Sequence, residues 1–276
     1  MYKLRVTVSV LTLFSVLLLQ AQDVKREVGK ATRNSHWEGK RVAFMGDSMT
    51  DPRRVGTSFL YWEYLAEMLG IVPSVFGLNG HQWNGIYQQA LKMHADQGPQ
   101  PDAIIIFAGT NDYNQGLPLG QLFNETTKVT NSDGKELSLK YRTPAINDTT
   151  FCGRINRVLS FLKDNYPQQQ VIMMTPIHRG YARFGKDNVQ PDENFANRRG
   201  LFIDDYVDVL KKAGSIWSVP VIDLYAISGL YPVSDAHVMY FTNKTSDRLH
   251  PNASGHYRLA TTIQYQLLAL PSGFAE

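Results

Sequence analysis

The chain has 276 residues, of which 43% are hydrophobic and 19% are charged. This composition is ordinary for a globular protein and excludes a chain that is disordered, collagen-like or coiled-coil throughout. The formal net charge is +3, and Lys and Arg are scattered along the chain, so we expect no nucleic-acid partner. The length is enough for one large domain or two small ones.

Residues 1–21 have the pattern of a secretory signal peptide. Lys3 and Arg5 form a short basic start, residues 6–19 are an almost unbroken apolar run, and Ala21 is a small residue suited to cleavage. The apolar run is shorter than the roughly 20 residues that a membrane-spanning helix needs, which disfavours a single membrane anchor. We therefore expect a secreted or periplasmic protein with no stable membrane insertion after cleavage.

Cys152 is the only cysteine in the chain. An internal disulfide is therefore impossible, and zinc sites built from several thiolates are excluded. An exported chain without disulfides fits a bacterial envelope better than a eukaryotic secretory route. His81 and His178 lack the spacing of metal ligands, so we predict neither a metal site nor another cofactor.

A polar arm over residues 22–40 leads into a region where apolar strands alternate with amphipathic helices. Ser58 is a candidate cap for the first helix, which Gly70 ends. In chain order, short apolar runs predict strands at residues 42–45, 71–78, 103–108, 171–174 and 219–224. The spacing of apolar residues predicts helices at about residues 59–68, 84–95, 155–162, 195–213 and 253–269.

Two stretches interrupt this alternation. Residues 114–149 are rich in Gly, Pro, Asn and Thr and contain the turn sequence Ser132-Asp133-Gly134, which predicts a loop insertion or a small hairpin lying over the parent fold. A second loop is expected over residues 178–193. The repeated strand–helix alternation indicates one α/β domain over residues 41–276, with parallel strands, right-handed crossovers and helices on both faces of the sheet.

Polar residues follow three of the predicted strands, and active sites of such folds collect at these carboxyl ends. Ser48 lies in Gly46-Asp47-Ser48 at a strand-to-helix turn, while Asn79-Gly80 and Gly109-Thr110-Asn111-Asp112 follow the next two strands. Backbone N–H groups at the start of a helix suit an incipient oxyanion. Taken alone, each cluster also fits an ordinary turn.

A fourth segment, Asp247-Arg248-Leu249-His250-Pro251, supplies a carboxylate and an imidazole near the end of the chain. A nucleophilic serine needs a base within hydrogen-bond reach and a group that orients this base. An Asp three residues before a His, in a loop held by Pro251, can lie beside Nδ1 and leave Nε2 for Ser48. The spacing alone is a weak signal, and its value comes from the other three segments.

These four segments, in this order, resemble the SGNH hydrolase superfamily, also called GDSL esterases and lipases. The resemblance covers about residues 41–270, with Met49 in place of the Leu of the family name. It implies a three-layer α/β/α sandwich with a parallel, flavodoxin-like, five-stranded sheet. The G-x-S-x-G sequence of the α/β-hydrolases is absent, which argues against that other fold.

The resemblance also implies roles for individual residues. Ser48 would be the nucleophile, His250 the general base and acid, and Asp247 the group that orients His250. An oxyanion hole would be formed by the backbone N–H groups of Ser48 and Gly80 and by the side-chain amide of Asn111. No cofactor is implied.

The function that follows is a secreted serine esterase acting through an acyl-enzyme. Exported members of the superfamily are often carbohydrate esterases, so we expect removal of short acyl groups, acetyl above all, from an acylated carbohydrate or other small molecule. The alternatives are a lipase, lysophospholipase or thioesterase of the same fold, or a non-catalytic glycan-binding module. Candidate substrate-binding residues near the predicted strand ends, which could equally pack against the domain, are Trp83, Tyr113, His178 and Arg179.

Overall fold

The computed structural model describes residues 23–28, 35–97, 101–270 and 274. The predicted signal peptide lies outside these residues, as does part of the arm over residues 22–40. Among the helices that the structure describes, none is both long and apolar enough to cross a bilayer.

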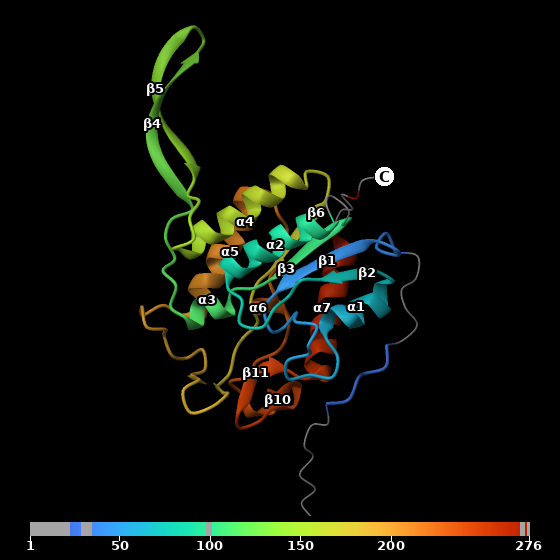
Figure 1. Ribbon diagram of the computed structural model, residues 1–276. Coiled ribbons are helices and arrows are strands. Elements are labelled where there is room, and N and C mark those ends of the chain that lie inside the picture. Colours follow the sequence, from blue (N-terminus) through green and yellow to red (C-terminus); the bar gives the residue numbers. More distant parts are fainter. Residues whose placement is uncertain (1–22, 29–34, 98–100, 271–273, 275–276) are drawn as a thin grey trace, which may run out of the picture.

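Five parallel strands form the central sheet, in the order β2-β1-β3-β6-β9 (Figure 1). This order confirms the flavodoxin-like sheet expected from the sequence. The predicted strands at residues 71–78 and 219–224 are shorter in the structure. The strands are β1 (Arg41–Gly46), β2 (Val72–Val75), β3 (Ala103–Phe107), β6 (Gln170–Met174) and β9 (Val221–Ile222).

Alternate residues of the central strands face two separate cores, because side chains of a strand point in turn to opposite faces of the sheet. Met45 and Ile106 contribute to one core, and Phe44 and Ile105 to the other, and all four are fully buried. Burial on both faces explains why β1 and β3 read as continuous apolar runs and not as alternating ones.

Helices cover both faces of the sheet and complete three layers (Figure 1). One face is covered by α2 (Trp83–Gln97), α4 (Phe151–Asn165) and α5 (Ile203–Trp217). The other is covered by α1 (Tyr61–Leu69) and α7 (Ala253–Ala269).

Two predicted helix starts are wrong. Ser58 does not cap α1, since its hydroxyl donates to the Asp23 carbonyl, and the Glu63 carboxylate instead accepts the Leu60 N–H at the start of the helix. The helix predicted from residue 195 begins only at Ile203. The side chain of Asn197 accepts the backbone N–H groups of Arg199 and Leu201, which holds this segment in a turn.

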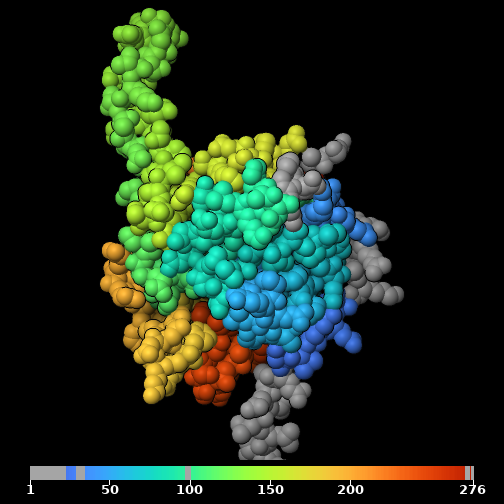
Figure 2. Space-filling model, in the orientation of Figure 1, coloured from blue at the N-terminus to red at the C-terminus, as the bar shows by residue number. Residues whose placement is uncertain are grey.

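The segment from residue 114 to residue 149 contains a long hairpin, and the prediction that it lies over the parent fold is wrong. Strands β4 (Phe123–Ser132) and β5 (Lys135–Pro144) project away from the body of the molecule as a separate arm (Figures 1 and 2). Asp133 and Gly134 have φ angles of 52° and 75°, the positive values that a tight two-residue hairpin turn requires.

A small antiparallel sheet lies beyond the carboxyl end of the central one and has the order β10-β11-β7-β8. Its strand β11 (Asp247–Pro251) carries the segment that we predicted to be a loop. The other strands are β10 (Phe241–Asn243), β7 (Ala182–Arg183) and β8 (Val189–Gln190). The remaining helices are α3 (Thr110–Asn114), α6 (Leu224–Ile227) and the 3₁₀ helix Asp235–Tyr240.

Candidate active site

Ser48 lies in the turn that follows β1. A Cβ on Gly46 would lie 2.7 Å from the Phe107 carbonyl oxygen and 2.2 Å from Thr50 Oγ1, so only glycine fits where the chain leaves the sheet. The Asp47 carboxylate accepts the Met49 N–H at 3.1 Å, and the Asp47 carbonyl accepts the Thr50 N–H at 3.0 Å. These contacts fix the conformation of the turn, in which Ser48 Oγ faces the side chain of His250.

Ser48, His250 and Asp247 form a continuous hydrogen-bonded row. Ser48 Oγ lies 2.9 Å from His250 Nε2, and His250 Nδ1 lies 2.9 Å from Asp247 Oδ2. The other oxygen of Asp247 accepts the backbone N–H groups of Leu249 and His250 at 3.1 and 3.0 Å. The carboxylate therefore has little rotational freedom and holds the imidazole with Nδ1 protonated and Nε2 facing the serine hydroxyl.

All three side chains are nearly enclosed, with exposed fractions of 4% for Ser48, 5% for His250 and 8% for Asp247. Burial strengthens their electrostatic coupling, because the surrounding protein screens charge less than water does. Asp47, beside the serine, is also buried, and burial raises the pKa of its carboxyl to about 6, although the Met49 N–H and His250 act in the opposite direction. The carboxyl group next to Ser48 therefore keeps its proton to a higher pH than an exposed Asp does.

The residues predicted to form an oxyanion hole lie at one cavity. Gly80 and Asn111 line the same cavity as Ser48 and His250. Within the described part of the chain, neither the Ser48 N–H nor the Gly80 N–H donates to a protein acceptor. Asn111 Nδ2 donates to the His81 carbonyl at 3.0 Å, which orients the amide and still leaves its second N–H. The structure thus brings together the residues expected to form an oxyanion hole.

The loop that carries Gly80 is held by a side chain from the serine loop. Asp51 accepts the Asn79 N–H at 2.7 Å and is itself paired with Arg53. Burial alone would raise the pKa of Asp51, but the hydrogen bonds from Arg53 and Asn79 outweigh it and lower the pKa below its usual value. These hydrogen bonds favour the charged form of Asp51, which anchors the Asn79-Gly80 turn.

The cleft above Ser48 has a volume of about 550 Å³ and a wall rich in side-chain amides. Part of this wall comes from the segment of residues 178–193, which forms β7 and β8. From this segment, Phe184 places its ring 5.3 Å from the His250 ring, measured between centroids. Phe184 could not be predicted to lie here, because an aromatic residue in a polar loop carries no periodic signal. The amide side chains that line the cleft are those of Asn79, Asn111, Asn114, Gln115, Asn188 and Gln190.

None of the four predicted substrate-binding residues lines the cleft, and the predictions for Trp83, Arg179 and His178 are wrong. Trp83 is fully buried in the core. Arg179 is only 1% exposed and binds the Thr110 carbonyl and Gln190 beneath the cleft wall. His178 pairs with Glu193 and its ring packs on another aromatic ring, so it does not face the cleft.

Tyr113, the fourth candidate, lines a second pocket next to the cleft. It is 4% exposed, and its hydroxyl donates to the Phe195 carbonyl at 2.6 Å. Tyr113 therefore lies near the predicted substrate site, but its hydroxyl already donates a hydrogen bond within the protein.

Within the described ranges, no group of three or more His, Cys, Asp or Glu side chains is placed so that it could hold a metal ion. His81 instead hydrogen-bonds Gln89, which also spans the Gly46 backbone.

A parallel α/β/α sandwich whose first strand leads to the serine loop is the fold of the SGNH hydrolases. A model of the GDSL-like Lipase/Acylhydrolase family matches residues 44–258. The chain belongs to the GDSL-like lipase/acylhydrolase family. A search of curated proteins gave no match.

Solved structures share this fold. A protein from Lactobacillus plantarum is 26% identical, with a TM-score of 0.63, over 84% of this chain and 98% of that one. A possible lipase from Chitinophaga pinensis is 20% identical, with a TM-score of 0.59, over 84% of this chain and 100% of that one. A lipase/acylhydrolase from Enterococcus faecalis is 18% identical, with a TM-score of 0.51, over 83% of this chain and 95% of that one.

Proposed function

We propose that this protein hydrolyses carboxylic esters through an acyl-enzyme intermediate on Ser48. The observation that carries the proposal is the row of hydrogen bonds from Ser48 through His250 to Asp247, with both distances at 2.9 Å. A serine hydroxyl is a poor nucleophile until a base takes its proton, and this row supplies the base and the group that orients it.

In the proposed reaction, Ser48 Oγ attacks the ester carbonyl carbon while its proton moves to His250 Nε2. Asp247 stabilises the imidazolium that forms. The imidazolium then gives its proton to the oxygen of the leaving alcohol, and the carbon–oxygen bond breaks to leave the acyl group on Ser48. Water attacks the acyl-enzyme with His250 again as base, which releases the carboxylic acid and restores the serine hydroxyl.

The negative oxygen of each tetrahedral intermediate would be held by the N–H groups of Ser48, Gly80 and Asn111. Loss of one such donor typically lowers turnover by about 10²–10³-fold. The unused backbone N–H groups of Ser48 and Gly80 support this role, since the protein itself leaves them available.

For the substrate, we propose short acyl groups, acetyl above all, carried by a carbohydrate. The amide-rich wall of the cleft offers donors and acceptors for hydroxyl groups, which a sugar presents and a hydrocarbon chain does not. Beside Asp47, the space between Met49, Phe107 and Pro176 is only about 10 Å³, which leaves no room there for an extended acyl chain.

Two measurements test the proposal. Purified protein should hydrolyse p-nitrophenyl acetate, and a Ser48→Ala variant with an unchanged melting temperature should be slower by at least about 10³-fold. Full activity in that variant would refute the assignment. Turnover of p-nitrophenyl octanoate faster than acetate would favour the lipase alternative, and glycan binding without turnover of any ester would favour the binding module.

We also propose that the enzyme acts outside the cytoplasm, on the basis of residues 1–21 alone. N-terminal sequencing of the mature protein after expression in a bacterial host tests this. Cleavage after Ala21 is the expected result, and an intact Met1 in the active cell fraction would contradict it.

A further inference from the structure

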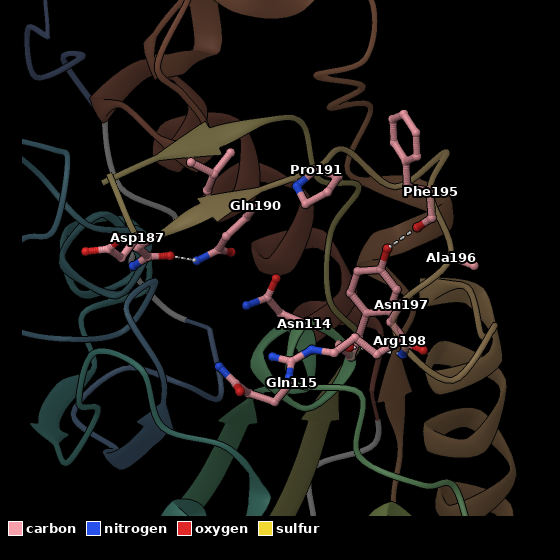
Figure 3. Close-up of a pocket in the computed structure, with 12 residues that line it drawn as sticks. Asn114, Gln115, Asp187, Gln190, Pro191, Phe195, Ala196, Asn197 and Arg198 are labelled. Carbon is pink, nitrogen blue, oxygen red and sulfur yellow. Dashed lines mark hydrogen bonds between the residues drawn. The ribbon is translucent and has the colours of Figure 1, made fainter. Parts of the chain in front are cut away.

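A second pocket, which we call the side pocket and which Figure 3 shows, has lining residues in common with the catalytic cleft. Its volume is about 280 Å³. The two cavities share one wall, so the side pocket lies directly next to the space above Ser48. The residues that line both cavities are Asn114, Gln115, Asp187, Asn188 and Gln190.

The shared wall is positioned by a buried arginine. Arg179 Nη2 donates to Gln190 Oε1 at 2.7 Å, and Gln190 Nε2 in turn donates to Asn188 Oδ1 at 3.0 Å. The Arg179 backbone N–H is held by the Glu193 carboxylate at 2.8 Å. The amide groups of the wall therefore have defined orientations before a ligand arrives, which lowers the entropic cost of binding.

The outer wall of the side pocket is equally fixed. Tyr113 OH donates to the Phe195 carbonyl, and Asn197 Nδ2 donates to the Tyr113 carbonyl at 3.0 Å. The residue Phe195 is nevertheless 61% exposed. Figure 3 shows the Arg198 side chain extending across the pocket toward Asn114 and Gln115, and within the described residues no carboxylate pairs with it.

These groups match one class of ligand. Amides and an arginine bind the hydroxyl oxygens of a sugar, and an exposed aromatic ring packs against the apolar face of a pyranose. We propose that the side pocket binds the glycosyl unit next to the one whose acyl group is removed. This inference rests on the proposed function, and it makes the preferred substrate an acetylated oligosaccharide or polysaccharide.

Phe195→Ala/Arg198→Ala is the test variant, because both side chains line only the side pocket. The probes are acetylated xylose, acetylated xylotriose and p-nitrophenyl acetate. The parent should show a kcat/KM for the trisaccharide at least about tenfold above that for the monosaccharide, and the variant should lose this preference. Turnover of p-nitrophenyl acetate should stay within about twofold of the parent. Lys186→Ala/Tyr265→Ala, two exposed positions outside both cavities, is the matched control.

An unchanged preference in the test variant, or no preference in the parent, overturns the inference. Failure of the parent to hydrolyse any ester would instead refute the proposed function. Binding of xylotriose to the Ser48→Ala protein by calorimetry separates the two results. The affinity should fall at least about tenfold on adding Phe195→Ala/Arg198→Ala, and an equal affinity, or no binding at all, contradicts the side-pocket inference.

An independent inference comes from the projecting hairpin of β4 and β5. Leu137, Leu139 and Tyr141 lie on one face of it and are 39%, 49% and 42% exposed. An isolated two-stranded hairpin is marginally stable in water, and its unpaired edges can accept another strand. The arm therefore has an apolar face and a free edge but no partner among the described residues.

The outer edge of β5 is complementary to itself. Hydrogen-bonded and non-hydrogen-bonded residue pairs alternate along β4 and β5, beginning with a hydrogen-bonded pair at the two-residue turn. The non-hydrogen-bonded pairs contain residues 136, 138, 140 and 142 of β5. The backbone N–H and C=O groups of these residues therefore point away from β4. Antiparallel pairing of two β5 strands about Leu139 places Glu136 opposite the partner's Arg142 and Leu137 opposite the partner's Tyr141. Because such a dimer is two-fold symmetric, each of these two pairs occurs twice in the interface. The same arrangement about the middle of β4 would instead place Lys128 opposite the partner's Lys128.

We infer that a second copy of this chain pairs with the first along β5 and forms a four-stranded sheet. The apolar residues of both arms then make one continuous stripe on a single face. Cross-strand pairs of opposite charge and of apolar residues stabilise such sheets. The interface is small, so the dimer is expected to be weak.

A cysteine substitution tests the proposed register between the two β5 strands. Leu139→Cys should form a disulfide-linked dimer when air oxygen oxidises the two thiols with copper–phenanthroline as catalyst, because the two Leu139 positions face each other as a closely spaced pair. Val129→Cys, on β4, is the matched control and should remain monomeric. Equal cross-linking of both variants would contradict the pairing.

Charge-reversal variants provide a second test. Their dissociation constants are measured from the molar mass by light scattering at increasing protein concentration. Glu136→Arg should raise the dimer dissociation constant about tenfold, and Glu136→Arg/Arg142→Glu should restore it. A parent that stays monomeric at its solubility limit, or a double variant that remains as weak as the single one, overturns the inference.

Discussion

Asp51 Oδ2 accepts the Asn79 N–H at 2.7 Å and so ties the loop that carries Gly80 to the loop that carries Ser48. Two turns from different strand ends are thereby fixed relative to each other by one buried carboxylate. The distance from Ser48 Oγ to the proposed Gly80 donor depends on this contact more than on any packing of Gly80, whose added Cβ would meet no atom within 4 Å.

Asp51→Ala should therefore impair the proposed reaction without removing a proposed catalytic residue. We expect kcat for p-nitrophenyl acetate to fall by about 10²-fold, comparable to the loss of one oxyanion donor, with a smaller change in KM. Arg53→Ala is the control, because Arg53 is the exposed partner of Asp51 and does not touch Asn79. A loss as large in Arg53→Ala would show that charge pairing, and not the Asn79 contact, is what matters.

Asp247→Asn should separate orientation of the imidazole from its presence. The amide keeps an acceptor for the backbone N–H groups but favours the wrong histidine tautomer, so kcat should drop by about 10⁴-fold while the melting temperature stays close to that of the parent. Steady-state kinetics and thermal denaturation at the same pH measure the two effects. Activity within tenfold of the parent would remove Asp247 from the mechanism.

The buried carboxyl of Asp112 should make the stability of the protein depend on pH. Burial raises the pKa of its carboxyl to about 7, although the Trp83 N–H and Arg154 act in the opposite direction. The folded chain thus binds a proton at this site that the unfolded chain has released, so the carboxyl costs stability increasingly as pH rises from about 4 to about 7. Above about pH 7 the cost is constant.

Asp112→Asn should therefore gain stability relative to the parent as pH increases across that window. The quantity to measure is the difference between the free energies of unfolding of the two proteins, from denaturant titrations at several pH values. Taking the difference cancels His256, whose pKa burial lowers to about 3 and whose effect has the opposite sign, being a loss of stability on acidification. A flat difference between pH 4 and 7 would contradict the prediction.

Removal of the hairpin arm should leave the catalytic cleft intact. Replacing residues 127–140 with Asn-Gly closes the arm at the Thr126–Tyr141 pair and keeps Phe123, which packs against the core. Turnover of p-nitrophenyl acetate should stay within about twofold of the parent, since no residue of β4 or β5 lines the cleft. A large loss would show that the arm acts on the site.

The central sheet could be predicted because burial on both faces makes its strands apolar throughout. The run of Ile104, Ile105 and Ile106 illustrates this, because three consecutive large apolar residues are typical of a strand that is buried on both faces. The contacts of His250 with Ser48 and Asp247 could be predicted because an activated serine needs a base and a group that orients it, and because the four segments occur in the order of a known family.

Other features left no comparable signal. Strand β11 consists of Asp-Arg-Leu-His-Pro, which lacks alternation and ends in proline, so its extended conformation depends on pairing with β10 and β7. The hairpin arm is exposed on both faces, and its sequence therefore resembles a loop. Trp83 was misplaced because its position after a strand end suggested the cleft, whereas the first turn of α2 directs it into the core.

Strand β11 carries both Asp247 and His250, and β7, from the cleft wall, pairs with it at Asp247 and Ala182. The Gly180 N–H and the Arg248 N–H complete the link through the carbonyls of Arg248 and Tyr181. In the proposed reaction, a bulky alcohol group that displaced this wall would also move the strand that carries His250. We therefore expect a poorly fitting ester to lose turnover rate as well as affinity.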